Sequence, residues 1–269
     1  MATILYDGKG NPISLTAEAK AVDYDRIMRS VNHRGYNTIA PENTLPAFKL
    51  SKAQGFNYVE CDLDFTADGV PVLLHDGTID RTSDGTGSVG SLTYEQLLQY
   101  DFGSWKSEAY AGTKIPTLEE FALLCRKIGL HPYIEIKGTL TAERASILVN
   151  IVKSVGLDVT WISFGAANLS AIKAVDETAR LGFIHEGEIT SAVIATAEGL
   201  KTDSNEVFLD CNYSYFTDSG VSLAIDAGIP LEVWTVNTEA AVLGLNDYIT
   251  GVTSDSIIAG KVIYDEVTV

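Results

Sequence analysis

Cysteine is scarce in this sequence, and the three that are present lie far apart at Cys61, Cys125 and Cys211. An odd number of cysteines with no Cys-x-x-Cys pair cannot all form internal disulfides, and their spacing is not that of zinc ligands. We therefore expect reduced, buried thiols. A disulfide scaffold and a structural zinc site are both excluded as the basis of the fold.

Positive charge is also in short supply. The chain has 19 Lys and Arg against 36 Asp and Glu, which gives a formal net charge of −17. Such a chain repels nucleic acid and anionic lipid headgroups within the screening length, so we expect no nucleic-acid partner. An anionic substrate would need local compensation from a few cations or a metal ion.

Long hydrophobic runs are missing as well. No stretch approaches the roughly 18 consecutive apolar residues of a membrane span. Residues 1–10 lack the basic start and apolar run of a signal peptide. We expect a cytoplasmic protein that does not insert into a membrane.

From about residue 31 the sequence alternates β-rich runs with amphipathic helical stretches, which indicates parallel strands joined by crossover helices. Eight strands are predicted, at 30–35, 58–66, 133–137, 159–164, 181–186, 206–213, 231–237 and 251–255. The helices predicted between them lie at 44–54, 117–128, 141–155, 166–177, 190–198, 217–227 and 238–245, several with a Thr as N-cap. Eight such units in series predict an α/β fold of the (β/α)8 TIM-barrel type. The alternative is an open doubly wound sheet, which usually has a Gly-rich first loop that Gly35 alone does not provide.

Two segments interrupt this alternation. Residues 1–30 read as an N-terminal extension with a hairpin and a short helix, open to homo-oligomerisation or attachment to another protein. Residues 76–116 form an insertion after the second strand, rich in Gly, Ser and Thr, with one small helix at 93–100. The predicted domain organisation is thus an extension at 1–30 and a barrel domain at 31–269 that includes the insertion.

Three carboxylates converge inside the predicted barrel. Side chains alternate along a strand, so Glu60 and Asp62 point inward together, and the same parity places Glu135 and Lys137 inward from the third strand. Like charges this close raise one another's pKa sharply unless a cation compensates them. An all-oxygen ligand set suits Mg²⁺ or Ca²⁺, so we expect one divalent cation here. The alternative is that each acid is a solvated strand end or an ion-pair partner of Lys137.

Two of the four histidines occupy the catalytic end of the predicted barrel. His33 ends the first strand and His75 follows the second, and active sites form at the C-terminal ends of barrel strands. Imidazoles at these positions suit proton transfer near neutral pH. His131 begins the third strand, at the opposite face, and is expected to be structural. For His185, at the end of the fifth strand, a pocket role and a structural role stay open.

The remaining candidates are two cations and two aromatic residues. Arg34 and Lys137 are the cations available to bind a phosphoryl or carboxylate group, with Arg able to bind in a bidentate manner. Phe164 and Trp234 lie at the catalytic ends of their strands. We expect these rings to form a pocket wall for substrate binding.

The chain resembles the glycerophosphodiester phosphodiesterases from about His33 to Asp255. The matching motifs occur in order and include His33-Arg34-Gly35, Pro41-Glu42-Asn43-Thr44, Glu60-Cys61-Asp62, Thr66-Ala67-Asp68-Gly69, Val72-Leu73-Leu74-His75-Asp76, Arg81-Thr82, Ile115-Pro116-Thr117-Leu118-Glu119-Glu120, Glu135-Ile136-Lys137 and Trp234-Thr235-Val236-Asn237. Ser254-Asp255 stands where the family usually has Thr-Asp, and Asp64 replaces a longer polar residue. We expect neither departure to touch the catalytic set.

The resemblance implies a TIM barrel with a divalent metal ion on Glu60, Asp62 and Glu135, and with His33 and His75 as acid and base. It also implies hydrolysis of small glycerophosphodiesters to an alcohol and glycerol 3-phosphate. Two alternatives remain open. One is a phospholipase C- or D-like enzyme that acts on lipids or lysolipids, and the other is a non-catalytic barrel module of a larger assembly.

Overall fold

Eight parallel strands close into a barrel in the computed structural model, which describes residues 5–6, 12–13, 29–245 and 248–255. The ring order is β3 (Arg29–Asn32), β4 (Tyr58–Phe65), β6 (His131–Ile136), β7 (Thr160–Ser163), β8 (Arg180–His185), β9 (Val207–Asn212), β10 (Leu231–Trp234) and β11 (Ile249–Ser254). Pairing of β3 with both β4 and β11 closes the ring. The predicted TIM barrel is confirmed, and the open doubly wound sheet is wrong.

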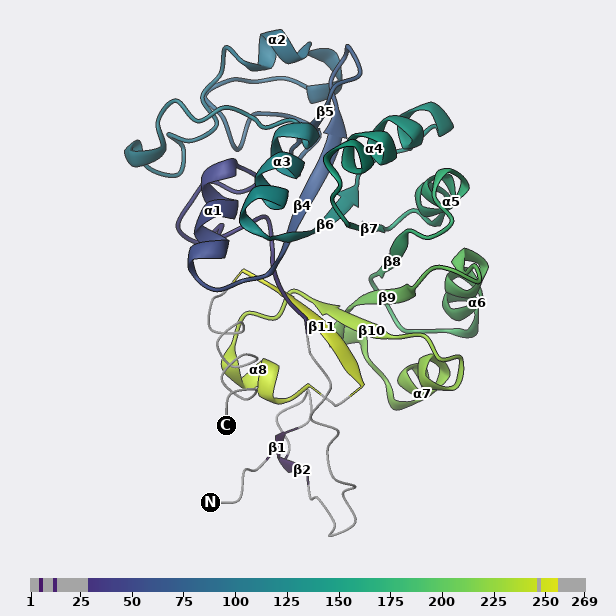
Figure 1. Cartoon of the computed structure of the whole chain (residues 1–269). Helices are drawn as coiled ribbons and strands as arrows, with labels where there is room; N and C mark the ends of the chain where they lie inside the picture. The colour runs from purple at the N-terminus through teal and green to yellow at the C-terminus, as the bar shows by residue number, and fades with distance from the viewer. Residues whose placement is uncertain (1–4, 7–11, 14–28, 246–247, 256–269) are drawn as a thin grey trace.

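Helices surround the strands in Figure 1, where α1 and α3 to α7 lie outside the ring. Their bounds are α1 (Leu45–Ala53), α3 (Leu118–Ile128), α4 (Ala142–Val155), α5 (Ala166–Val175), α6 (Ser191–Leu200), α7 (Asp218–Asp226) and α8 (Glu239–Leu243). Five predicted Thr N-caps accept a backbone N–H, for example Thr117 from Glu120 and Thr141 from Arg144. Thr44 is the exception, because its hydroxyl donates to the carbonyl of Pro41 instead.

The core has an outer and an inner part. Outward strand residues such as Val59, Cys61 and Leu63 pack against the helices, and Cys61, Cys125 and Cys211 are free and buried, as expected. Inside the ring, Val31, Tyr133, Ile162, Ile184 and Phe208 form a separate apolar cluster. The inner cluster forms a packed floor below the C-terminal ends of the strands, so any site at that end is a cup and not a channel.

A glycine makes the inner cluster possible. A Cβ at Gly182 of β8 would lie 2.3 Å from Cζ of Phe208 and 2.8 Å from Cγ2 of Ile162. The Phe208 ring occupies the space that a side chain at this position would need. Gly182 therefore sets how closely the interior side chains pack.

Buried ion pairs fill the N-terminal end of the barrel, below the apolar cluster. The Glu232 carboxylate is 2.6 Å from Arg180 and 3.1 Å from Arg29. Here His131 contacts the hydroxyl of Thr160 at 2.9 Å, and burial together with the charge of Arg180 lowers the pKa of His131 to about 4. This placement agrees with the structural role expected for His131.

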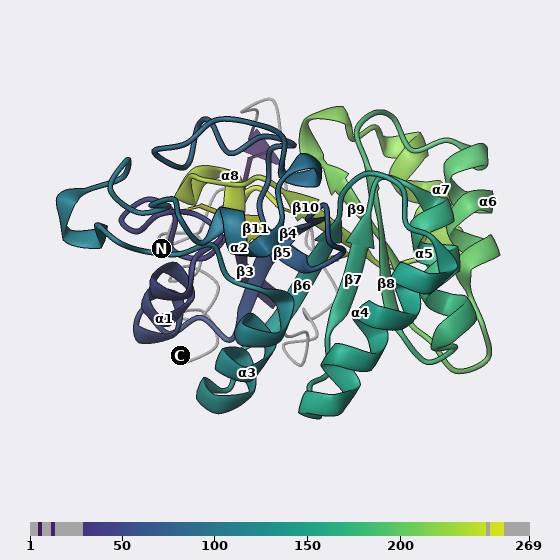
Figure 2. The same cartoon turned by 90° about the horizontal axis from the view of Figure 1, so that it is seen from above.

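The insertion begins after an additional strand, β5 (Pro71–Leu73), which pairs antiparallel with the end of β4. It contains α2 (Tyr94–Leu97) and the short 3-10 turns η1 (Val89–Ser91) and η2 (Glu108–Tyr110). A small apolar cluster, which includes Ile79, Leu97 and Phe102, gives the insertion its own core. It lies to one side of the ring in Figure 1, and Figure 2 shows the same arrangement from above.

At the N-terminus, β1 (Leu5–Tyr6) pairs antiparallel with β2 (Pro12–Ile13), which agrees with the predicted hairpin. The short helix predicted after it lies outside the described residues. Among the described helices, none has the length and apolar character needed to cross a membrane.

Candidate active site

Three carboxylates meet inside the C-terminal end of the barrel. Glu60 and Asp62 project inward from β4 and Glu135 from β6, where Asp62 and Glu135 are register partners. One oxygen from each of the three lies within 4.8 Å of the others, and all three residues are buried. The strand parity of the sequence predicted this convergence.

The cluster holds more negative charge than its surroundings readily accommodate. Burial, followed by the charge of Asp62, raises the pKa of Glu60 to about 8 and that of Glu135 to about 7. Burial also opposes ionisation of Asp62, but Lys137 and Arg34 outweigh it and hold the pKa of Asp62 below its usual range. Three carboxylate groups with excess negative charge fit a hard divalent cation.

Two cations border the cluster. Lys137 Nζ is 2.7 Å from Glu135 Oε1 and 3.0 Å from Asp62 Oδ1, and Arg34 Nε is 3.1 Å from Asp62 Oδ2. Arg34 also pairs with Glu42, which in turn binds Arg81 of the insertion. Both predicted cations therefore lie next to the acids, half-buried at the edge of the cavity.

The backbone turns sharply where Arg34 enters the site. Arg34 and Gly35 have φ values of 54° and 74°, so the first strand ends at Asn32 and not at residue 35 as predicted. A Cβ at Gly35 would lie 2.8 Å from that of Ala47, which leaves room only for glycine. The turn aims the backbone N–H of Arg34 at Glu60 Oε2, at 2.9 Å.

His33 is held by a carboxylate from the opposite end of the chain. Its Nδ1 lies 2.7 Å from Asp255 Oδ1, and its Nε2 lies 3.9 Å from Glu60. Burial lowers the pKa of His33, but the hydrogen bond to Asp255 and the charge of Glu60 outweigh burial and raise it overall. The expectation that Ser254-Asp255 does not touch this set is wrong, because closure of β11 on β3 brings Asp255 against His33.

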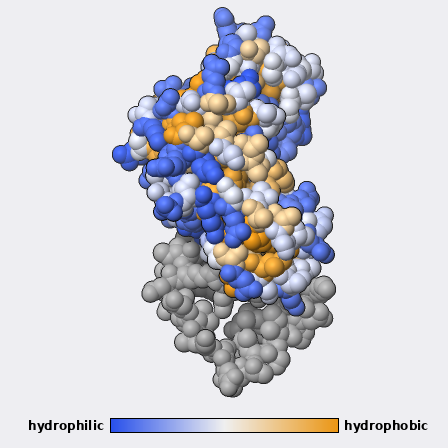
Figure 3. Space-filling model, turned by 90° about the vertical axis from the view of Figure 1, so that its right-hand side faces the viewer, coloured by the Kyte–Doolittle hydropathy of each residue, from blue (hydrophilic) through white to orange (hydrophobic). Residues whose placement is uncertain are grey.

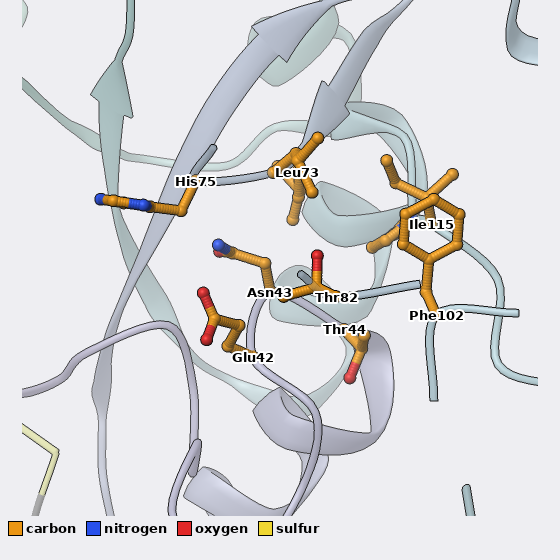
Figure 4. A pocket seen from close by; sticks show the side chains of 10 residues that line it. Glu42, Asn43, Thr44, Leu73, His75, Thr82, Phe102 and Ile115 are labelled. Atoms are coloured by element: carbon orange, nitrogen blue, oxygen red, sulfur yellow. The ribbon is translucent and has the colours of Figure 1, made fainter. Parts of the chain in front are cut away.

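His75 has a similar arrangement within a local segment. Its Nδ1 lies 2.7 Å from Asp76 Oδ1, and Arg81 Nε donates to Asp76 Oδ2 at 2.7 Å. In Figure 4, His75 lies above Glu42 and Asn43, beside a small cavity of about 10 Å³ between the barrel loop and the insertion. The insertion thus helps to fix the position of His75.

Asn43 is a site residue that the sequence reasoning did not single out. Its side-chain N–H donates to Asp62 Oδ2 at 2.8 Å, and its oxygen accepts from the backbone N–H of Asp62 at 3.1 Å. Asn43 has a φ of 57°, a conformation that asparagine tolerates better than most residues. The Pro41-Glu42-Asn43-Thr44 motif could have drawn attention to Asn43, but the motif alone does not predict its contacts with Asp62.

Several of these groups line one open cavity of about 290 Å³. Its wall contains His33, Arg34, Glu60, His75, Glu135, Lys137, Ile162, Phe164, Ile184, Glu186, Asp210, Trp234, Thr235 and Thr253. The Phe164 and Trp234 rings meet edge to face, with centroids 5.8 Å apart. His185 is not among the lining residues, and its Nε2 contacts the backbone oxygen of Glu188 at 3.0 Å.

Comparisons with known proteins show to which family the chain belongs. The model of the glycerophosphoryl diester phosphodiesterase family matches residues 33–259. This chain belongs to that family. Among solved structures, an Oleispira antarctica phosphodiesterase in complex with the product sn-glycerol-3-phosphate is similar, with 30% identity, a TM-score of 0.81, and coverage of 90% of this chain and 98% of that one.

Curated relatives carry the same family name. A Bacillus subtilis glycerophosphodiester phosphodiesterase is 28% identical over 90% of this chain and 87% of its own length. Glycerophosphodiester phosphodiesterase 1 of Bos taurus is 42% identical over 42% of this chain. The match to the cattle protein covers 35% of that protein's length.

Proposed function

We propose that this protein hydrolyses glycerophosphodiesters to an alcohol and glycerol 3-phosphate. The observation that carries the proposal is a pair of imidazoles, His33 and His75, each hydrogen-bonded to an aspartate. Both line one cavity together with Glu60 and Glu135 of the acid cluster. Family membership supports it, as does the similar Oleispira antarctica phosphodiesterase, which is in complex with the product sn-glycerol-3-phosphate.

Glu60, Asp62 and Glu135 are the residues that would hold a divalent cation, Mg²⁺ or Ca²⁺. Such an ion, when bound, neutralises charge on the phosphoryl group and lowers the pKa of an oxygen that it contacts. Arg34 and Lys137 bind the phosphate from the same side of the cavity. Phe164 and Trp234 form an apolar wall that packs against the carbon atoms of the substrate.

The two histidines move protons on opposite sides of phosphorus. With Nδ1 occupied by an aspartate, each ring exposes Nε2 to the cavity, so one neutral imidazole accepts a proton and one imidazolium donates a proton. The first takes the proton of the glycerol 2-hydroxyl, whose oxygen attacks phosphorus. The second protonates the oxygen of the leaving alcohol as the P–O bond to that oxygen breaks. In the next step the second imidazole, now neutral, takes a proton from the water that attacks the cyclic phosphate. The P–O bond to the 2-oxygen breaks, and the first imidazolium returns the proton to that oxygen, which leaves glycerol 3-phosphate. A nucleophile on the same substrate avoids the entropy cost of ordering a separate water.

A substrate analogue tests this route. Replacing the 2-hydroxyl of glycerophosphocholine with hydrogen keeps the diester and removes the nucleophile, so we expect turnover to be lost. Choline release from the parent and the 2-deoxy compound measures the difference. Turnover of the analogue at a rate near the parent's would show that water attacks directly.

The function itself is tested by alcohol and glycerol 3-phosphate release from a panel of glycerophosphodiesters. Because general acid–base groups contribute roughly 10²–10⁴-fold, His33→Ala and His75→Ala should each lower turnover by that order. His185→Ala is the matched control, since that ring does not line the cavity. Absence of release from every diester, or wild-type turnover in both cavity variants, would contradict the proposal.

A further inference from the structure

One buried carboxyl group faces the cavity and is not used by the proposed chemistry. Asp210 of β9 is only 3% exposed and lines the cavity wall. Its Oδ1 has no hydrogen-bond partner among the described residues. An unsatisfied buried polar group is costly, so a side chain of this kind calls for a partner that the free protein does not supply.

The position of Asp210 is fixed relative to the acid cluster. In the ring order, β9 is four strands from β4 in either direction, so Asp210 lies across the barrel from Glu60 and Asp62. The indole N–H of Trp234 donates to the backbone oxygen of Asp210 at 3.0 Å and ties β9 to the aromatic wall. The carboxyl group therefore lies at a defined place on the side of the cavity that faces the phosphate-binding residues.

The chemistry of Asp210 suits a hydroxyl group. Burial, with further contributions from Glu232, Glu60 and Glu135, raises the pKa of Asp210 well above its usual range. A neutral carboxyl group both donates and accepts a hydrogen bond, as an alcohol does, and an ionised one still accepts from an alcohol. A hydroxyl group is thus a suitable partner in either protonation state.

We infer that Asp210 binds the terminal hydroxyl of the glycerol half of the substrate and so selects glycerol over other alcohols. This inference rests on the proposed function. The head-group alcohol varies in size among glycerophosphodiesters, so it fits best at the open edge of the cavity, where Phe164 is 49% exposed. The glycerol half is constant, and a buried polar group of fixed position gives strong discrimination against an analogue without its hydroxyl.

A cycle of two enzymes and two substrates tests the contact. The metal-loaded wild type and Asp210→Ala are compared on glycerophosphocholine and on the analogue whose terminal CH₂OH is CH₃ and whose 2-hydroxyl is kept. We expect Asp210→Ala to lower kcat/KM about 10- to 100-fold on glycerophosphocholine, the range of a hydrogen bond to a buried polar group. On the analogue, the variant should match the wild type within about twofold.

Two further variants separate recognition from a structural effect. Asp210→Asn keeps a donor and an acceptor, so it should recover much of the activity on glycerophosphocholine. Asp203→Ala, on the exposed loop before β9, is the control and should leave kcat/KM unchanged for both substrates. An equal loss on both substrates, or no loss on either, would overturn the inference and make Asp210 a structural residue.

A binding measurement keeps the test independent of turnover. Calorimetry measures the affinity of the wild type and of Asp210→Ala for glycerol 3-phosphate and for its analogue without the terminal hydroxyl. Asp210→Ala should weaken binding of glycerol 3-phosphate only, and equal weakening of both ligands would overturn the inference. A wild type that binds glycerol 3-phosphate through Asp210 but cleaves no diester would contradict the proposed function alone.

Discussion

The two cavity histidines differ in what holds their aspartates. Asp255 accepts from the side-chain amides of Asn37 and Asn237 as well as contacting His33, so its carboxylate has several fixed donors. Asp76 is held by Arg81 from the more exposed insertion. We therefore expect Asp255 to act as a positioning residue for His33, because the barrel itself fixes its contacts, whereas the position of His75 depends on the insertion.

Changing Asp255 should affect proton transfer more than folding. In Asp255→Asn the hydrogen bond and the charge that raise the pKa of His33 are weakened, so the limb of the pH–rate profile that reports His33 should move to lower pH. Turnover should fall about 10- to 100-fold, as for other groups that orient a functional histidine. Asp226→Asn, an exposed change on α7, serves as the control. An unshifted profile would contradict the positioning role.

The acid cluster predicts a pH-dependent response to metal ions. Because the pKa values of Glu60 and Glu135 are raised to about 8 and 7, the metal-free protein should lose stability as the pH rises from about 5 to 8. A divalent cation binds the ionised carboxylates, so Mg²⁺ or Ca²⁺ should raise Tm more at pH 8 than at pH 5. Thermal unfolding after chelation and re-addition measures this, with NaCl of equal ionic strength as control. Equal shifts at both pH values would contradict it.

At the scale of elements, periodicity predicted what repeats locally. All eight strands and seven intervening helices occur in the predicted order and at the predicted places in the chain, although β3 ends at Asn32 and β10 at Trp234, before their predicted ends. Two-residue and 3.6-residue patterns reflect which side chains of an element are buried. The alternation of side chains along β4 and β6 also correctly predicted that Glu60, Asp62 and Glu135 lie together. Asp255 and Asn43 were missed for different reasons. The first reaches His33 only through ring closure, and the second depends on a left-handed backbone turn.

Two glycines, one inside the barrel and one in an outer helix, should respond in opposite ways to substitution by alanine. Gly182→Ala places a methyl group against Phe208, so the free energy of unfolding should fall by about 1–3 kcal/mol. Gly199→Ala lies in α6 with no atom within 4 Å of the new Cβ, so it should raise that free energy by about 0.5–1 kcal/mol. Denaturant unfolding of both variants measures the contrast. Equal effects would show that the interior tolerates the added volume.

At the scale of the whole molecule, the surface and the net charge of −17 bear on the kind of substrate that reaches the cavity. Figure 3 shows one face, on which hydrophilic side chains are interspersed with separate hydrophobic patches. Interfacial enzymes usually combine buried apolar area with basic residues that attract anionic lipids. We therefore predict that this protein cleaves a deacylated diester faster than a bilayer lipid.

A comparison of substrate forms checks this preference. Turnover of glycerophosphocholine or glycerophosphoethanolamine should exceed that of lysophospholipid micelles and vesicles of matched head group. Ile39→Ser is a useful companion variant, because Ile39 is a large apolar side chain in the loop after β3 with 54% exposure. Faster cleavage of the lipid forms, together with a selective loss in Ile39→Ser, would place the enzyme on the phospholipase branch.

The contact between His33 and Asp255 also has a consequence for synthesis of the protein on the ribosome. The two residues are 222 positions apart, and they meet only after β11 has paired with β3. A nascent chain that has emerged through β10 can contain both cavity histidines, the three clustered acids and both cations, and still lack the carboxylate of Asp255 that contacts His33. Under the proposed function, catalytic competence arrives together with ring closure, so a growing chain that has not yet closed its barrel would present its substrate with an incomplete site.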